Sequence, residues 1–339
     1  MAEQTIRYIQ EQDVVSLVNM SDAITVLEQV LLQQGKGQVR NISKALGAWG
    51  EGCSMHALGS FMTDQGYAGF KTWMHTPRNG GSLFSLFDAY SGRLLALIEA
   101  RALGMLRTAA ITGVATKVLA PRQARVAALI GTGPQAVTQL AALASVQALD
   151  QVRVFSPTAE KRDAFVRLLA PKYSFEMRSC NSLDEALQGA EIVTTITRAT
   201  DAFIHDHQLE ACRHINAIGA ILPTKAEFST ACLQRANLLV VDDKENALKG
   251  SRELRELLGT EADSWGAVKT LGEMLASTHQ PAHATDMSFF KGMGMGISDL
   301  AVAGLVFERA QQQDRGIMLP AQTRQNLLLE EYTKSKETT

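Results

Sequence analysis

The sequence is poor in cysteine and proline and carries almost no net charge. Its 339 residues include 4 cysteines, 8 prolines, 33 basic and 35 acidic side chains, which gives a formal net charge of −2. Without an excess of positive charge, the chain lacks the field that attracts nucleic acid or an anionic membrane surface. Without proline-rich stretches, charge blocks or repeats, it also lacks the composition of a disordered scaffold.

Metal binding and secretion are not expected either. The cysteines are scattered with no C-x-x-C spacing, at Cys53, Cys180, Cys212 and Cys232. This arrangement argues against a zinc knuckle and a redox pair. No signal-peptide pattern follows Met1, and no run approaches the roughly 18 apolar residues that span a bilayer. We therefore expect a cytoplasmic protein with free thiols, no metal site and no membrane partner.

The sequence contains enough apolar residues for two domains, and the pattern of apolar residues differs between its two parts. Apolar residues make up 46% of the chain, and this length is typical of two domains. Between about residues 42 and 99, short apolar runs alternate with turn signals at Asn79-Gly80-Gly81 and Ser91-Gly92. This pattern predicts a largely antiparallel sheet. After Pro121, apolar strands alternate with helices, which predicts a doubly wound parallel sheet.

Four helices outside the alternating region are predicted from their caps and spacing. The first begins at Ser21-Asp22 and is stopped by Gly35 and Gly37. An apolar helix runs from about Ala100 to Leu119 and is ended by Pro121. A third begins near Gly296, and a fourth is indicated over residues 322–334.

A glycine-rich turn directly after the first strand of the alternating region is the most informative motif. The strand ends at Ile130, and the turn comprises Gly131, Thr132, Gly133, Pro134, Gln135 and Ala136. In a G-x-G-x-x-A turn the first glycine permits the tight bend, the second lets the backbone approach a pyrophosphate, and the third small residue lets strand and helix pack. The helix that follows directs unpaired N–H groups at the phosphates. The motif therefore predicts a dinucleotide site.

The end of the next strand indicates which dinucleotide is bound. An NAD-specific site usually carries an acidic residue there for the ribose 2′-hydroxyl. Here Ser156 and Thr158 are neutral, and Lys161 and Arg162 follow. We expect NADP(H) or NAD(H), and this pattern favours NADP(H). If Lys161 and Arg162 form only a solvated helix face, the preference disappears.

Several segments together resemble the ornithine cyclodeaminase/mu-crystallin family. They cover nearly the whole chain: Leu86-Phe87-Asp88-Ala89, Ser91-Gly92-Arg93-Leu94-Leu95-Ala96, Leu103-Gly104-Met105-Leu106-Arg107-Thr108-Ala109-Ala110, Gly131-Thr132-Gly133, Ile215-Asn216-Ala217-Ile218-Gly219-Ala220, and Phe290-Lys291-Gly292-Met293-Gly294 with Asp299. The resemblance implies a homodimer of α/β class, with a Rossmann domain and an α+β substrate-binding and dimerisation domain. We therefore expect residues 1–119 and 311–339 to form the substrate domain and residues 120–310 the cofactor domain.

Members of this family act on a carbon that bears a carboxylate and an amine or imine. The resemblance implies that Arg40, Lys71 and Arg107 bind substrate, with Lys71 and Arg107 catalytic. If Lys71 faces inward from its apolar strand, as the resemblance implies, burial would lower its pKa and suit it to proton transfer. The strand pattern alone favours an outward Lys71 whose stem covers apolar surface. Arg107 in an apolar helix is suited to a bidentate grip on a substrate carboxylate; a structural ion pair is the alternative. His56 is placed among the substrate-binding residues, where cyclodeaminases have an acidic residue; it is equally compatible with a core histidine.

Further cofactor contacts are expected at Thr108, Thr197, Gly219, Ala220 and Ile221. The last of these departs from the cyclodeaminase pattern, because an aspartate that follows the glycine pair there assists departure of the amine. Isoleucine neither accepts a proton nor holds an ammonium group, so Ile221 favours a reductase or dehydrogenase.

The leading hypothesis is therefore an NAD(P)-dependent oxidoreductase that transfers hydride between nicotinamide and the α-carbon of a small imino or amino acid. An ornithine cyclodeaminase-like ammonia-lyase with catalytic NAD is the first alternative. A non-catalytic protein that binds NADP(H) or a small ligand is the second.

Overall fold

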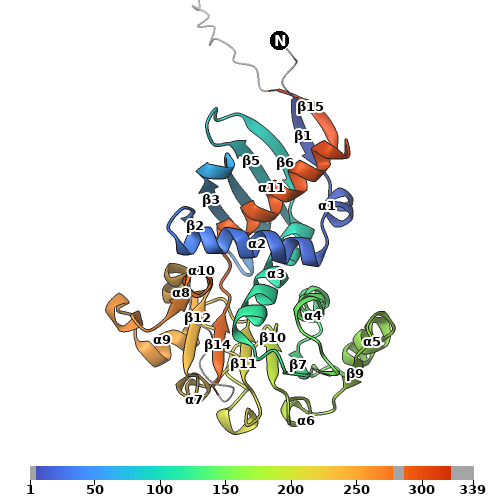
Figure 1. The fold of residues 1–339 in the computed structure, drawn as a ribbon, viewed down its shortest axis with the longest axis vertical. Coiled ribbons are helices and arrows are strands. Elements are labelled where there is room, and N and C mark those ends of the chain that lie inside the picture. The colour runs from blue at the N-terminus through green and yellow to red at the C-terminus, as the bar shows by residue number, and fades with distance from the viewer. Residues whose placement is uncertain (1–4, 278–285, 322–339) are drawn as a thin grey trace, which may run out of the picture.

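A computed structural model describes residues 5–277 and 286–321. Two β-sheets divide the molecule (Figure 1), with seven strands in one and eight in the other. The seven-stranded sheet lies at the top of Figure 1, the eight-stranded sheet lies at the bottom, and helix α2 runs between them.

The first sheet is built from both ends of the described chain. Its strands are β1 (Thr5–Ile9), β2 (Arg40–Trp49), β3 (Cys53–Met62), β4 (Tyr67–His75), β5 (Gly80–Asp88), β6 (Leu94–Glu99) and β15 (Ile317–Pro320). Their order is β15-β1-β6-β5-β4-β3-β2. Strands β2 to β6 pair antiparallel, as the turn signals predict. Strands β1 and β15, for which no sequence pattern predicted a strand, pair with each other at one side of the sheet.

The second sheet is entirely parallel and doubly wound. Its strands are β7 (Val126–Ile130), β8 (Gln151–Phe155), β9 (Glu176–Ser179), β10 (Ile192–Thr195), β11 (His214–Ala217), β12 (Leu238–Val241), β13 (Lys269–Thr270) and β14 (Ser288–Lys291). Their order is β13-β12-β14-β11-β10-β7-β8-β9. The order reverses at β7, where the connections change from one face of the sheet to the other. Such a reversal is where dinucleotides bind in this architecture, and the predicted α/β class is confirmed.

Helices cover both sheets. They are α1 (Glu11–Leu17), α2 (Met20–Gly35), α3 (Arg101–Leu119), α4 (Pro134–Val146), α5 (Ala159–Leu169), α6 (Leu183–Leu187), α7 (Thr230–Gln234), α8 (Lys244–Gly250), α9 (Arg252–Leu258), α10 (Leu271–Ala276) and α11 (Gly296–Gln312). Short 3-10 turns lie at Thr63–Gln65, Ala170–Lys172, Asp206–Gln208 and Ala262–Trp265.

The start of α2 corrects the sequence reading. Asn19, rather than Ser21-Asp22, caps the helix: its side chain accepts the Asp22 N–H, and the Asp22 carboxylate accepts the Asn19 N–H. This reciprocal pair is a capping box. The helix predicted over residues 322–334 lies outside the described residues.

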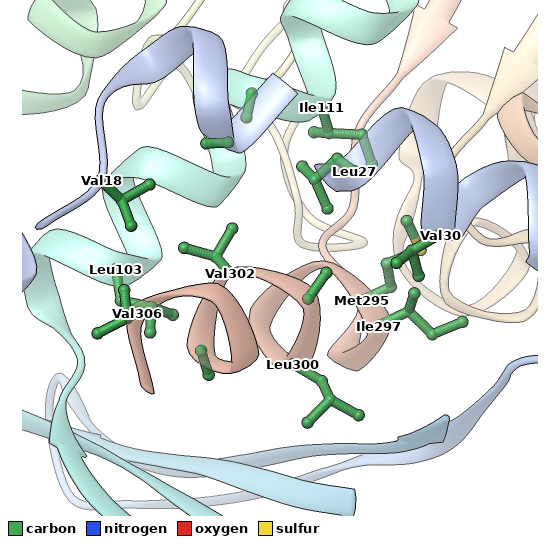
Figure 2. Close-up of a cluster of buried hydrophobic side chains, with 14 of the residues drawn as sticks. Val18, Leu27, Val30, Leu103, Ile111, Met295, Ile297, Leu300, Val302 and Val306 are labelled. Atoms are coloured by element: carbon green, nitrogen blue, oxygen red, sulfur yellow. The ribbon is translucent and has the colours of Figure 1, made fainter. Parts of the chain in front are cut away.

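Residues 120–310 were expected to form the cofactor domain, and this range includes most of α11. In the structure, α11 packs with the first sheet instead. It contacts β3, β4 and α2, and Figure 2 shows Leu300 and Val306 of α11 in the same apolar cluster as Leu27 of α2 and Leu103 of α3. The chain therefore returns to the first sheet at the turn before Gly296. The reason is that α11 is apolar on almost every side and must be covered by a sheet on one face and helices on the other.

Helix α3 also differs from expectation. No run in the sequence was expected to be long and apolar enough to span a membrane, but Arg101–Leu119 is, by length and composition alone. Helices α1 and α2 would form a second candidate span only if they counted as one helix, and the pair is bent by 83°. In the structure 61% of the apolar 18-residue stretch of α3 is buried, and the helix packs against α2 and α4. This burial is typical of a core helix. Through α4, α3 connects the first sheet to the dinucleotide turn.

Candidate active site

Three charged side chains from three distant elements meet where the two sheets face each other. Nζ of Lys71 on β4 lies 2.7 Å from Oδ1 of Asp299 on α11. Nε of Arg107 on α3 lies 3.2 Å from the same oxygen. The Arg107 contact is an ion pair without hydrogen-bond alignment, since Nε has no hydrogen-bond partner among the described residues. One carboxylate oxygen therefore neutralises two cations.

Local sequence explains why each group points to this spot. On β4 the even-numbered Phe70 and Met74 are exposed, whereas Lys71 is buried, as strand alternation requires. Gly104 on α3 lies beside the ammonium group, because a Cβ built there would be in ordinary van der Waals contact with Lys71 Nζ, at 3.5 Å. Asp299 lies in the first turn of α11 and is fully buried.

The electrostatics of this cluster favour a lysine that exchanges its proton near neutral pH. Burial and, to a lesser extent, the positive charge of Arg107 lower the pKa of Lys71 to about 8, against the opposing effect of Asp299. A lysine with this pKa is protonated at pH 7 and releases its proton readily, which is what a general acid requires. Asp299 touches both cations but is itself inaccessible, so it positions them.

An aromatic platform lies beside Lys71 and carries a further cation. The Lys71 ammonium lies 4.9 Å from the ring centre of Trp73, and that of Lys44 lies 5.7 Å from the same ring. His56 stacks on Trp73 with ring centres 4.6 Å apart and planes 2° apart. Burial lowers the pKa of His56, and Lys44 and His75 lower it further, so this histidine is neutral at pH 7.

The end of the parallel sheet contacts this cluster through Gly294. Asp242, directly after β12, accepts the backbone N–H groups of Met293 and Gly294, which follow β14. Burial raises the pKa of Asp242 to about 6. A Cβ on Gly294 would lie 3.0 Å from Nη1 of Arg107, so the guanidinium lies directly against this turn. The charged cluster and the carboxyl edge of the parallel sheet therefore form one continuous region.

The glycine-rich turn has the geometry that a dinucleotide requires. Gly131 has φ +113°, and a Cβ there would lie 2.7 Å from the Ile196 carbonyl oxygen, so only glycine fits. At Gly133, the N-cap of α4, a Cβ would meet nothing within 4 Å. Pro134 is the first residue of α4, Thr132 and Gln135 are half-buried, and Ala136 is fully buried beneath the turn. Gly133 thus leaves open space at a helix N-terminus, and these residues fit a bound pyrophosphate.

A buried glutamate holds the two loops that complete this edge. One carboxylate oxygen of Glu227 accepts hydrogen bonds from both N and Oγ1 of Thr197, at 2.9 and 2.7 Å. The other accepts from the N–H groups of Gly219 and Ala220, at 3.0 and 3.2 Å. A Cβ at Gly219 would lie 2.3 Å from Glu227, so glycine is required there. Glu227 thereby connects three predicted cofactor contacts, although no sequence motif marks it.

At the end of β8, where the ribose of a dinucleotide is expected, Arg162 is buried and its guanidinium is held by hydrogen bonds within the protein. Its nitrogens donate to Ser179 Oγ at 2.8 Å, to Asn181 Oδ1 at 3.0 Å and to the Ser156 carbonyl at 3.3 Å. Thr158 is the N-cap of α5 and is exposed. The guanidinium therefore lies behind Ser156 and fixes the loop, rather than on the solvated helix face considered above; Lys161 is the exposed cation.

Arg40 is not brought to the cluster in this chain. It pairs with Phe61 across the β2–β3 ladder, and Phe61 pairs with Ala68, three residues from Lys71. Because side chains alternate between faces, Arg40 lies on the face opposite to Lys71 and is exposed. Substrate binding by Arg40 stays a prediction, and the cation that faces the cluster from β2 is Lys44.

The structure also shows the surroundings of two other predicted cofactor contacts, Thr108 and Ile221. Thr108 donates its hydroxyl hydrogen to the Gly104 carbonyl at 2.7 Å, so only its oxygen lone pairs are left for a ligand. Ile221 is 39% exposed in the loop after β11.

No sequence motif pointed to a role for Lys44, Trp73, Asp242, Glu227 or Asp299. Asp299 carries a usable signal: a lone acid within the apolar helix of residues 296–307 needs a buried cation. Lys44 had no such signal. Within residues 5–277 and 286–321, no three histidine, cysteine or acidic side chains come together as a metal site.

Comparisons with known proteins cover most of the chain. The sequence profile of the ornithine cyclodeaminase/mu-crystallin family matches residues 5–314. Ketimine reductase mu-crystallin of Mus musculus is 33% identical over 223 residues, which are 66% of this chain and 67% of that protein. Δ1-Pyrroline-2-carboxylate reductase of Bacillus cereus is 31% identical over 233 residues, 68% of this chain and 71% of that protein. An archaeal alanine dehydrogenase dimer with bound NAD superposes with a TM-score of 0.85 at 26% identity, over 93% of this chain and 99% of that chain.

Proposed function

Because the chain belongs to the ornithine cyclodeaminase/mu-crystallin family, we propose that it works as an NAD(P)-dependent oxidoreductase on CH–NH groups. The reaction is hydride transfer between nicotinamide and the α-carbon of a small imino or amino acid. Its family relatives include reductases of a ketimine and of a cyclic imine.

The observation that carries this proposal is the buried Lys71–Asp299–Arg107 cluster at the carboxyl edge of the parallel sheet. When bound, the nicotinamide supplies or accepts the hydride. Gly131, Gly133 and the start of α4 would hold its pyrophosphate, and Thr197, Gly219 and Ala220 would border the dinucleotide. The terminal nitrogens of Arg107, which lie against Gly294, would bind the substrate carboxylate. Lys71 gives its proton to the imine nitrogen as the α-carbon gains the hydride, and it recovers a proton from solvent.

The setting of Ile221 supports reduction over cyclodeamination. In a cyclodeaminase the carboxylate at this position assists departure of ammonia, and an exposed isoleucine has no group to do so. Reduction of an imine requires one hydride and one proton, and Lys71 is sufficient for the proton. A catalytic Lys71 also distinguishes an enzyme from a protein that only binds the dinucleotide.

For the dinucleotide, we favour NADP(H). Ser156 and Thr158 offer hydroxyl groups where NAD-specific sites carry an acid, and the Arg162 guanidinium directly behind Ser156 adds positive charge. A 2′-phosphate is thereby tolerated and a 2′-hydroxyl is not required.

A homodimer is proposed from the outer face of the first sheet. Exposed apolar side chains gather there on β2, β3 and β4: Ile42, Met55, Phe61, Phe70 and Met74. A contiguous apolar patch of this kind is typical of an interface. The superposed alanine dehydrogenase is a dimer, and a second copy of this chain is the partner we propose. For its location we propose the cytoplasm, which suits four cysteines that are all free thiols.

The test is an assay of the purified protein with NADPH or NADH. Substrates are 2-oxo acids with ammonia or methylamine, and cyclic imines that carry a carboxylate. Loss of one reduced cofactor per amine formed is expected. Formation of proline and ammonia from ornithine with no net cofactor consumption would overturn the proposal in favour of a cyclodeaminase. Tight cofactor binding with neither activity would make the protein a binder.

A further inference from the structure

One cation more than the proposed reaction requires faces the active site. Arg107 suffices for the substrate carboxylate and Lys71 for the proton. Lys44 is half-buried beside them, with its ammonium 5.7 Å from the centre of the Trp73 ring that Lys71 also approaches, at 4.9 Å. Among the described residues, no carboxylate lies within salt-bridge distance of Lys44.

The backbone of β2 explains why Lys44 points inward. The pairing of β2 with β3 shifts register between Ile42 and Ala45. Asn41, before the shift, points inward and accepts the N–H of Ile297, and Lys44 lies within the shift. A β-bulge redirects a side chain at such a site and is common beside active sites.

The three cations destabilise one another. Burial lowers the pKa of Lys44, and the positive charge of Arg107 lowers it further, against the opposing charge of Asp242. Burial also has the largest effect on the pKa of Lys71, and Arg107 and Lys44 both add to it. The acids that face them are Asp299, shared by Lys71 and Arg107, and Asp242, whose oxygens accept backbone N–H groups. Neither forms an ion pair with Lys44. A fold that keeps like charges together at this cost indicates an anionic ligand.

A second polar group beside Lys44 lacks a partner. Nδ1 of His56 is buried and makes no hydrogen bond within the described residues, whereas Nε2 lies 3.0 Å from Ser54 Oγ. His56 stacks on Trp73, the ring that Lys44 approaches. An orphaned ring nitrogen next to an unpaired ammonium is a suitable pair of groups for a carboxylate oxygen.

We propose that Lys44, with His56 and Trp73 beside it, binds a second carboxylate of the substrate, so that the enzyme acts on dicarboxylic imino acids. This inference rests on the proposed function. Arg107 holds the carboxylate on the reacting carbon, and Lys44 holds the one at the far end of the side chain. The covalent step is unchanged: the C=N carbon gains hydride from NAD(P)H, the nitrogen gains a proton from Lys71, and NAD(P)⁺ leaves.

The experiment compares substrates of equal chain length with and without the second acid. Holoenzyme with NADPH is assayed on 2-oxoglutarate against 2-oxopentanoate, and on oxaloacetate against 2-oxobutanoate, each with methylamine. The wild type is expected to prefer the dicarboxylates by about 10- to 100-fold in kcat/KM, the size of one charge-assisted contact. Lys44→Gln is expected to abolish the preference, and Lys44→Arg to retain it. Lys36→Gln, an exposed lysine at the end of α2, is the control and should retain it too.

A binding measurement separates this inference from the proposed function. Glutarate and pentanoate are titrated by calorimetry into the NADP⁺-loaded wild type and Lys44→Gln, with circular dichroism to show that the variant is folded. Glutarate binding that depends on Lys44 would support the second-carboxylate site even if no imine were reduced. Equal affinity of the wild type for the two probes, or an equal loss for both in folded Lys44→Gln, would overturn it.

Discussion

The ammonium nitrogen of Lys71 lies 2.7 Å from Oδ1 of Asp299, although 228 positions separate the two residues in the sequence. Both side chains are buried, so neither charge is stabilised by water. A buried pair of this kind is costly to break, by about 3–5 kcal/mol, because one uncompensated charge would be left behind. The pair therefore joins β4 to α11 and holds the ammonium in place with its proton available.

Replacing Lys71 should separate catalysis from cofactor binding. Lys71→Met removes the proton donor and keeps an unbranched side chain, so kcat should fall by about 100-fold or more. NADPH affinity, measured by fluorescence titration, should stay within about twofold because Lys71 is outside the glycine-rich turn. Near-normal turnover by this variant would remove Lys71 from the mechanism.

The pH profile should report on Asp299. Reduction requires protonated Lys71, so kcat/KM is expected to fall as pH rises through its pKa of about 8. Asp299→Asn removes the negative charge that raises this pKa, and the falling limb should move to lower pH by about one unit. Glu308→Gln changes another acid of α11, one that contacts Tyr67, and should leave the profile unchanged. An unshifted limb in folded Asp299→Asn would contradict the coupling.

The two glycines of the dinucleotide turn should respond differently to alanine. Gly131→Ala forces a Cβ to 2.7 Å from a backbone oxygen at φ +113°, so the melting temperature should fall. Gly133→Ala meets nothing in the protein and should leave melting nearly unchanged while weakening NADPH binding by about tenfold or more, because the methyl group occupies the phosphate position. Differential scanning fluorimetry with and without NADPH distinguishes the two effects. Equal behaviour of the two variants would argue against a phosphate at this turn.

Cofactor preference should depend on the residue at the end of β8. Ser156→Asp places a carboxylate where NAD-specific proteins accept the ribose 2′-hydroxyl and repels a 2′-phosphate. The ratio of kcat/KM for NADPH over NADH should fall by about tenfold or more. Ser156→Asn supplies a matched neutral control. If the wild type already prefers NADH strongly, the proposed preference for NADP(H) is wrong.

Stability at mildly acidic pH should depend on His214. This histidine is fully buried between Ser288 Oγ and Asn216 Oδ1, and burial lowers its pKa to about 4. The unfolded chain takes up a proton near pH 6.5 whereas the folded chain does not, so stability should fall as pH drops from about 7 towards 4. The contribution is about 3 kcal/mol. Chemical denaturation of wild type and His214→Gln at several pH values measures it, and parallel curves for the two proteins would contradict it.

Local features of the sequence were sufficient for the dinucleotide turn and the elements on either side of it. A strand, the Gly131–Ala136 turn and a helix capped by Gly133 lie within a short stretch, and the backbone geometry of each requires the residue type found there. The apolar character of β4 likewise identified Lys71 as exceptional. These inferences use interactions between near neighbours, which a sequence pattern records.

The substrate half depended on contacts that no local pattern records. The register shift after Ile42 turned Lys44 inward and left Arg40 on the opposite face, and a displacement of one residue reverses every side chain beyond it. Helix α11 joined the first sheet rather than the second because its apolar faces fit between that sheet and α2.

The sequence by itself thus determined the class of fold and the glycine-rich turn, and its family resemblance singled out Lys71 and Arg107. Only the tertiary structure decided which acid neutralises them, which further cation lies beside them and which glutamate holds the cofactor loops. The physical reason is distance along the chain. Asp299, Lys44 and Glu227 act through space on groups far from them in sequence, and only the folded chain brings them together.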